Sequence, residues 1–343
     1  MEERSAPSNI SDPAWLLRRG IELLGASGRA MVVDLIARAR AASPGDPDIG
    51  AVCRILETHK VPRFHATMLQ DAARNRAYRA AIEQFVPGRR VLDIGTGSGL
   101  LAMMAARAGA ASVVACEQDP RLARTAREII ARNGLADRIT VIDRPSFELE
   151  RQRDLDGGVD CVVSEIFSEN LLGEGVLGAL AHARSELCNP GAVFLPERAS
   201  IRIALAQAPA TDEPPDEVEG FSLAPFARHV SASKSIRSDH PQLALRSAPQ
   251  TAFEFQWTAD SDPPASAHAI SGLECLGGTV NAVAQWIELR FLPGHTYENA
   301  PGSGHGHHWL NPLTPIPPRT SAAGDTARIR SWYCDEHLTH REI

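Results

Sequence analysis

The pattern of apolar and polar positions along the chain predicts three regions of different architecture. Residues 1–60 carry apolar side chains at helical spacing, interrupted by a proline- and glycine-rich break at 43–48. Residues 61–196 alternate helical patterns with short apolar runs at 91–94, 113–116, 139–142 and 159–163, which is typical of a doubly wound α/β domain. Residues 197–343 hold strand patterns between turn-rich segments, which favours a β-rich domain.

The predicted fold class is therefore α/β: a Rossmann-like domain with an N-terminal helical cap and a C-terminal β-barrel-like domain. Two N-terminal helices before the break resemble one tetratricopeptide repeat, and a solenoid needs about three. We interpret them as a cap, a remnant packing face or a dimer contact. One helical stretch is expected over 64–85. Strands are expected at 200–205, 251–257, 280–291 and 327–333, and the polar stretch 208–250 is interpreted as an interaction arm, a candidate for dimerisation.

Composition narrows the class of protein. The chain of 343 residues is long enough for about two domains, and no apolar run reaches the roughly 18 residues of a membrane span. The N-terminus lacks the apolar segment of a signal peptide. A net charge of −7 argues against nucleic acid as a partner and suits a cationic substrate. Six scattered cysteines indicate reduced thiols, so we expect a cytoplasmic protein. From the net charge and the lack of a long apolar run, we expect neither a nucleic-acid nor a membrane partner.

A glycine-rich turn after the first predicted strand points to a nucleotide cofactor. Gly95 and Gly97 let the backbone approach a ligand, and the start of the next helix presents N–H groups to it. Glu117, at the next strand end, is placed to accept hydrogen bonds from ribose hydroxyls. A dinucleotide fingerprint needs glycine where this chain has Leu100. The turn is similar instead to the S-adenosylmethionine site of class I methyltransferases, which adds Asp93 to the cofactor-binding candidates.

Two acids bracket a loop at the end of the fourth predicted strand. Glu165 and Glu174 lie nine residues apart, between the strand and a helical pattern at 176–187. Open α/β sheets bind ligands at the carboxyl ends of their strands. Two carboxylates there can hold a guanidinium, a planar cation with N–H donors on two edges. Taken alone, the pair is more simply interpreted as two solvated loop acids.

Together, these motifs resemble the arginine N-methyltransferase family. That family carries two glutamates at this spacing and a helix with the pattern H-x-x-M-L-x-D-x-x-R, which occupies residues 65–74 here. Its T-H-W motif appears as H-H-W at 307–309, and the segments 187–196 and 220–223 are also similar. The likeness covers residues 64–312. The sequence G-E-G around Glu174 resembles the monomethylating branch, and a bacterial methyltransferase of free arginine is a further match.

The resemblance implies roles for the matching residues. Arg74 would pair with the cofactor carboxylate, and Met68 would pack near the sulfonium. Glu165 and Glu174 would clamp the guanidinium and concentrate electron density on the attacking nitrogen. The family also implies a homodimer and a further cofactor contact at Ser146.

A second pair is implied between the two domains. Asp71 and His308 would bridge them and take part in proton removal, and Trp309 would contact the substrate. Three features depart from the family: no tyrosine precedes His65, and isoleucine and histidine stand at 166 and 307, where tryptophan and threonine are usual. The departures affect the expected acceptor size and product. The histidines at 305, 307 and 308 have no companion acids or cysteines at ligand spacing, so no metal is expected.

The sequence leaves the acceptor open. Free L-arginine or a small arginine metabolite, as in natural-product biosynthesis, is slightly favoured over an arginine in a protein. A ribosomal-protein or other amine methyltransferase is an alternative enzyme, but it predicts an N-P-P-Y or N-I type motif where Ser164, Glu165 and Ile166 stand. A non-catalytic cofactor-binding scaffold is the alternative from another class.

Overall fold

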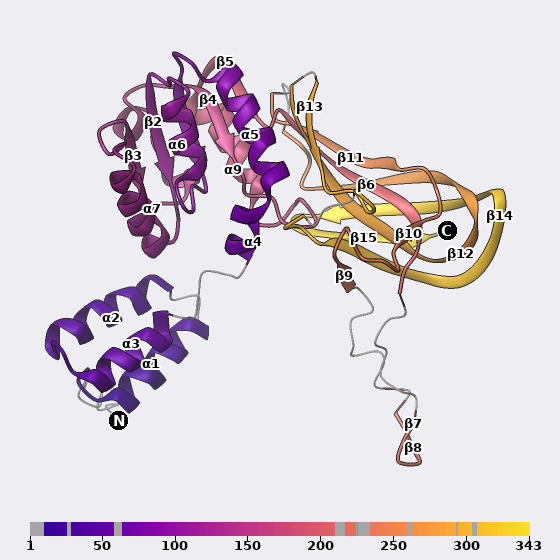
Figure 1. Cartoon of the computed structure of the whole chain (residues 1–343), viewed down its shortest axis with the longest axis horizontal. Coiled ribbons are helices and arrows are strands. Elements are labelled where there is room, and N and C mark those ends of the chain that lie inside the picture. The colour runs from indigo at the N-terminus through magenta and orange to yellow at the C-terminus, as the bar shows by residue number, and fades with distance from the viewer. Residues whose placement is uncertain are drawn as a thin grey trace, which may run out of the picture.

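The computed structural model describes residues 10–25, 29–57, 64–209, 217–223, 225, 234–258, 262–292, 294–303 and 307–343. Figure 1 shows three parts: a group of N-terminal helices, an α/β part, and an elongated β domain. No helix in these ranges is long and apolar enough to cross a membrane.

The N-terminal part consists of α1 (Pro13–Gly25), α2 (Arg29–Ala42) and α3 (Pro47–Glu57), which pack on one another. Asp12 and Asp46 start α1 and α3 by accepting backbone N–H groups of the first turn. Leu16, Ile49 and Leu56 are buried in a hydrophobic core that is separate from the main core. The tetratricopeptide likeness and the boundary at residue 60 stay predictions.

The stretch 64–85, predicted as one helix, is two: α4 (Phe64–Gln70) and α5 (Ala72–Phe85). Asp71 separates them, with φ −72° and ψ 87°, and its Oδ1 accepts the Arg74 N–H at 2.9 Å. A capping aspartate replaces a helical hydrogen bond with a side-chain one, so a helix can start anew at this position. The break directs Asp71 toward the β domain.

Five parallel strands form the sheet of the α/β part, in the order β3-β2-β1-β4-β5. They are β1 (Arg90–Ile94), β2 (Ser112–Cys116), β3 (Ile139–Ile142), β4 (Val159–Ser164) and β5 (Cys188–Leu195). The intervening helices are α6 (Leu100–Arg107), α7 (Pro120–Arg132), α8 (Arg151–Leu155) and α9 (Val176–His182), with a 3-10 turn Ser146–Glu148 and a π turn Ala183–Leu187. Strand order reverses between β1 and β4, where Ile94 pairs with Ser164. Ligands of such sheets bind at this reversal point, so the turn after β1 and the loop after β4 lie side by side.

The β domain is an eight-stranded antiparallel sheet. Its strands are β6 (Arg198–Gln207), β9 (Lys234–Ile236), β10 (Ala244–Leu245), β11 (Gln250–Gln256), β12 (Ser266–Leu292), β13 (His295–Glu298), β14 (Asn311–Cys334) and β15 (His337–Glu342). The predicted strands 280–291 and 327–333 are parts of the much longer β12 and β14. The sequence hid their length because bulges shift the pairing near Leu276 and Ala282, and because prolines at 312, 315, 317 and 318 lie within β14.

The predicted arm 208–250 is only partly described, since residues 210–216, 224 and 226–233 lie outside the described ranges. Its last part was wrongly predicted as irregular, because β9 and β10 belong to the sheet of the β domain. Its hairpin, β7 (Glu217–Val218) with β8 (Phe221–Ser222), extends away from the sheet (Figure 1) and leaves the Phe221 side chain 72% exposed.

The α/β part and the β domain share one continuous hydrophobic core. Tyr78 of α5 packs edge-on against Phe291 of β12, with ring centroids 4.6 Å apart, and donates its hydroxyl to the Ser164 carbonyl at 2.8 Å. Burying an aromatic ring between two sheets while its hydroxyl is satisfied stabilises their contact. Helix α5 therefore holds the β domain beside the carboxyl ends of β1 and β4.

Candidate active site

The turn after β1 has a backbone that glycine favours. Gly95, Gly97 and Gly99 have φ of 72°, 54° and 81°, a region that side chains disfavour. A Cβ on Gly95 would lie 2.4 Å from Ile166 Cγ2, so glycine lets the turn touch the residue after Glu165. The cofactor turn and the loop of the two glutamates are therefore in contact.

The predicted cofactor acids lie around this turn. Glu117, at the end of β2, accepts the Gly97 N–H at 3.0 Å, and burial raises the pKa of its carboxyl. Asp93 accepts from the Thr96 hydroxyl at 2.5 Å and from the Ala102 N–H at 3.1 Å through Oδ2. Burial raises the pKa of Asp93 to about 6. Its Oδ1 is buried without a hydrogen-bond partner in the described part of the chain.

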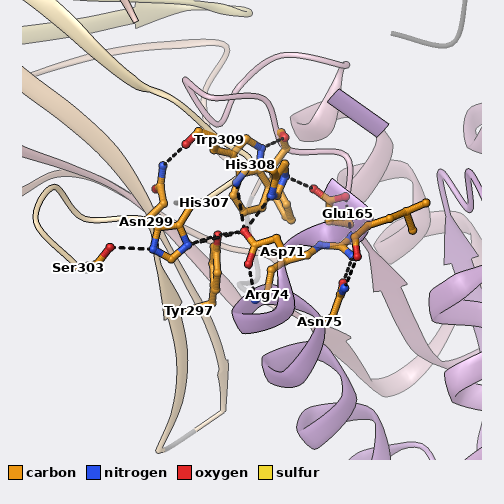
Figure 2. Close-up of polar contacts among 12 residues, drawn as sticks. Asp71, Arg74, Asn75, Glu165, Tyr297, Asn299, Ser303, His307, His308 and Trp309 are labelled. Atoms are coloured by element: carbon orange, nitrogen blue, oxygen red, sulfur yellow. Dashed lines mark hydrogen bonds and ion pairs between the residues drawn. The ribbon is translucent and has the colours of Figure 1, made fainter. Parts of the chain in front are cut away.

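Arg74 of α5 is buried against Glu165. Its Nη2 donates to Glu165 Oε2 at 2.6 Å, and its Nη1 donates to Asn75 Oδ1 at 2.8 Å (Figure 2). The guanidinium lies 4.9 Å from the ring centre of Tyr78. Only 2% of the Arg74 side chain and 5% of the Glu165 side chain are exposed, so each charge depends on the other for compensation. Arg74 thus orients one of the two predicted clamp residues.

Asp71 forms the centre of a buried polar network between α5 and the β domain (Figure 2). Its Oδ2 accepts the Tyr297 hydroxyl at 2.6 Å, and the backbone N–H and Nδ1 of His308 at 3.2 Å each. His308 Nε2 lies 3.8 Å from Glu165 Oε1. The predicted Asp71–His308 pair therefore forms, and it reaches Glu165.

The network continues through His307 to Ser303. The Tyr297 hydroxyl donates its hydrogen to Asp71. In its contact with His307 at 2.8 Å the hydroxyl oxygen is therefore the acceptor, and Nδ1 of His307 carries the hydrogen. His307 Nε2 then meets the Ser303 hydroxyl at 2.9 Å. His307 thus serves the network around Asp71. Of the other histidines considered for a metal, His305 lies outside the described residues.

The network shifts the pKa values of Asp71 and His308 in opposite directions. Burial would raise the pKa of Asp71, but contacts from the two histidines, the Arg74 amide and Tyr297 outweigh it and hold the pKa far below its usual range. Burial alone would lower the pKa of His308, but its contacts with Asp71 and Glu165 outweigh this and raise it. The arrangement favours ionised Asp71 beside protonated His308.

Glu174 lies in a loop with unusual backbone geometry. Leu171 and Glu174 have φ of 73° and 63°, which is rare for residues other than glycine. The Ser168 hydroxyl oxygen accepts the Gly173 N–H at 2.8 Å. A Cβ on Gly173 would lie 2.6 Å from the same oxygen, so the contact requires glycine.

Negative charge accumulates around Glu174. Desolvation, with the charges of Glu165, Glu117 and Glu336, raises the pKa of Glu174 to about 7. The structure therefore brings both predicted clamp acids and the predicted ribose acid into one electrostatic unit. A cation entering this unit would relieve their repulsion.

The remaining predicted site residues lie around these groups. Trp309 is 5% exposed and donates its indole N–H to the Phe167 carbonyl at 2.7 Å, so it holds the loop after Glu165 in place. Met68 is half-buried on α4, and Ser146 is buried in the turn that follows β3. In the described ranges, no group of three or more His, Cys, Asp or Glu side chains is placed to hold a metal ion.

Comparisons with known proteins all match methyltransferases. A family model described as ribosomal protein L11 methyltransferase (PrmA) matches residues 79–195, within the α/β part. The arginine N(omega)-methyltransferase of Streptomyces achromogenes subsp. streptozoticus is 37% identical over 80% of this chain and 77% of its own length. The chain belongs to the arginine N-methyltransferase family. Protein arginine N-methyltransferase 7 of Oryza sativa subsp. japonica is 34% identical over 78% of this chain, which spans only 39% of that protein.

Solved structures of the family share the fold. The Trypanosoma brucei PRMT1 enzyme–prozyme heterotetrameric complex with AdoHcy superposes with a TM-score of 0.69 and 25% identity, covering 81% of this chain and 96% of that one. Arabidopsis thaliana protein arginine methyltransferase 10 superposes with a TM-score of 0.68 at 20% identity, covering 83% and 97%. The combination of a Rossmann-like domain and an antiparallel β domain is thus that of the arginine N-methyltransferases.

The residues at the reversal point fit the expected cofactor, S-adenosylmethionine. The left-handed glycine turn leaves its backbone open to close approach by a ligand. Arg74 Nε is buried and has no hydrogen-bond partner among the described residues, although the guanidinium is otherwise engaged. A buried unsatisfied donor calls for a partner, and a carboxylate is what an arginine matches best. The donor set therefore suits the cofactor of this family.

Two residues of the site escaped the sequence prediction. Tyr297 meets Asp71 from a position 226 residues away along the chain, and Glu336 meets the Glu174 loop from the turn between β14 and β15. No local motif marks either, because each acts through tertiary contact alone. The one signal in the sequence near Tyr297 is His307, which stands where the family usually has threonine.

Proposed function

We propose that the protein transfers a methyl group from S-adenosylmethionine to a guanidino nitrogen of free L-arginine or a small arginine derivative. The observation that carries the reaction is the electrostatic unit of Glu165, Glu174 and Glu117 beside the glycine turn. Desolvation, together with the repulsion between these carboxylates, raises the pKa of Glu174, and a guanidinium compensates their charge.

The cofactor supplies an electrophilic methyl on a sulfonium. Gly95, Gly97, Glu117, Arg74 and Asp93 would hold it, with Ser146 and Met68 nearby. Glu165, held by Arg74 on one oxygen and facing His308 on the other, presents a fixed carboxylate to one edge of the guanidinium. Glu174 binds a second edge, and this alignment of nitrogen and methyl supplies the rate.

The reaction releases one proton from the guanidinium nitrogen. Asp71 is unsuited to accept it, because its pKa is held far below its usual range, and the raised pKa of His308 favours the form that already carries a proton. Glu174 is better matched, since its pKa is already raised to about 7 before the acceptor binds. In this scheme Asp71 and His308 position Glu165, Glu174 takes the proton, and Trp309 shapes the loop.

Two observations bear on the acceptor. The Streptomyces relative, which this chain matches over most of both lengths, is named for arginine itself. The protein arginine relatives favour a peptidyl arginine as the second candidate, but this chain spans a minority of the rice protein. The test is to incubate the enzyme and methyl-labelled cofactor with L-arginine and, in parallel, with an arginine-containing peptide. Labelled methylarginine by mass spectrometry is expected with free arginine, and labelling of the peptide alone would contradict the small-acceptor proposal.

Further proposals concern organisation and setting. We place the domain boundaries at 1–60, 61–196 and 197–343, and propose a cytoplasmic homodimer active in natural-product biosynthesis. The exposed Phe221 on the projecting hairpin supports a contact between copies through the arm 208–250. Size-exclusion chromatography with light scattering tests the dimer. The intact protein should have twice the mass of one chain, and a monomer at micromolar concentration would contradict the proposal.

A further inference from the structure

The turn between β14 and β15 contacts the loop that carries Glu174. The Gly175 N–H donates to Glu336 Oε1 at 2.9 Å, and Asn170 Nδ2 donates to the Glu336 carbonyl at 3.0 Å. These two contacts join the loop to the C-terminal end of the chain, 161 residues beyond Gly175.

The Glu174 loop needs external support. Leu171, Glu174 and Gly175 all have left-handed backbone, at φ of 73°, 63° and 68°. Strained residues keep such conformations only when surrounding contacts hold them. Gly175 is the N-cap of α9 and has no side chain to accept the N–H groups of the first turn, while its own N–H is bound by Glu336.

The turn that presents Glu336 is firmly attached to the β domain. Arg319 of β14 donates two hydrogen bonds to Glu342 of β15, at 2.7 and 2.6 Å. His340 of β15 is buried, bonded to Ser331 at 2.8 Å and to Gln285 of β12 at 2.9 Å. A bidentate ion pair and a buried three-residue network tie β15 to β14 and β12, so the strand that follows the turn is anchored in the β domain.

We propose that Glu336 is a positioning residue for Glu174: the turn between β14 and β15 holds the left-handed loop so that Glu174 faces Glu165 across the acceptor site. This inference rests on the proposed use of Glu174 as a clamp. Glu336 acts through the backbone of Gly175 and touches neither acceptor nor cofactor.

The charge of Glu336 has a second, separable effect. The charges of Glu165 after β4, Glu117 after β2 and Glu336 in the turn all act on Glu174, while Arg74 compensates Glu165. All three carboxylates disfavour ionisation of Glu174. Removing the charge of Glu336 therefore lowers the pKa of Glu174, and the acid limb of the profile of kcat/KM against pH moves to lower pH.

Two substitutions separate the hydrogen bond from the charge. Glu336→Gln keeps an oxygen to accept the Gly175 N–H but loses the charge, and Glu336→Ala loses both. Glu274→Gln is the matched control, because it removes one exposed carboxylate from β12 of the same domain. Each is compared with wild type by melting temperature, hydrogen exchange of residues 168–176, and kcat/KM from pH 5.5 to 9 with the acceptor that wild type methylates.

At pH 8.5, where Glu174 is ionised, we expect Glu336→Ala to lower kcat/KM about tenfold while Glu336→Gln and Glu274→Gln stay near wild type. Exchange in the loop should rise only in Glu336→Ala. The acid limb should move to lower pH in Glu336→Gln and stay in place in Glu274→Gln. Equal behaviour of all three variants in exchange and rate, or a loss in Glu336→Gln as large as in Glu336→Ala, would overturn the inference. Hydrogen exchange needs no acceptor, so an inactive wild type would count against the proposed function and leave this test standing.

Discussion

Replacing Asp71 tests the network that joins the two domains. Asp71→Ala removes the cap of α5, which is worth about 1 kcal/mol, and the charged hydrogen bond from Tyr297, worth about 1.5–3 kcal/mol. With the His308 contacts also lost, the free energy of unfolding should fall by about 3–5 kcal/mol. The loss is large because Asp71 and Tyr297 are only 5% and 4% exposed, so water cannot replace the missing partner.

Urea unfolding, followed by tryptophan fluorescence, measures this change. Tyr297→Phe alone should cost about 1.5–3 kcal/mol, since the ring stays and only the hydroxyl is lost. The cost of the double variant should be smaller than the sum of the two single costs, by about the strength of the hydrogen bond that both residues share. Asp137→Ala, at an exposed site, is the control. Additive costs, or an Asp71→Ala effect no larger than that of Asp137→Ala, would refute the network.

Three further changes have expected outcomes. Folding raises the pKa of His308 from 6.5. The contribution of His308 to stability is therefore complete below pH 6.5 and is lost as the pH rises through the pKa of the folded state. In urea titrations, His308→Gln should abolish this part of the pH dependence. Gly173→Ala should reduce kcat/KM at least about tenfold, because the new Cβ displaces Ser168, whereas Gly178→Ala, with nothing within 4 Å, should not. Arg74→Ala leaves Glu165 buried without its partner, so calorimetry should show weakened cofactor binding and kinetics a lower kcat; unchanged values would contradict the role given to Arg74.

Much of the α/β part could be predicted from its sequence because its signals are local. Short apolar runs between helical patterns mark β1 to β4, and the glycines of the turn mark the cofactor side. The spacing of Glu165 and Glu174 indicated one loop at a strand end, and the structure brings both into a single electrostatic unit. Periodicity and spacing are sufficient to predict a residue's role where that role depends on its neighbours in the chain.

The β domain was harder because its features depend on distant contacts. Prolines and glycines within β12 and β14 look like turns, yet bulges and long-range pairing absorb them. The break at Asp71 was missed because the helical pattern continues on both sides of a capping side chain. Tyr297 and Glu336 reach the site across 226 and 161 residues, and no spacing rule connects positions so far apart.

The central claim is that two carboxylates clamp a guanidinium in front of a methyl donor. The most direct measurement is the initial rate of methyl transfer to L-arginine, and to an arginine-containing peptide, by wild type, Glu165→Gln and Glu174→Gln. Glu169→Gln is the matched control from the same loop, since an amide oxygen can still accept the Ser235 hydroxyl that Glu169 binds at 2.6 Å. Both clamp variants should lose at least about a hundredfold in kcat/KM, while Glu174→Gln keeps the cofactor affinity of wild type and Glu169→Gln keeps its activity. Wild-type rates in either clamp variant would contradict the account.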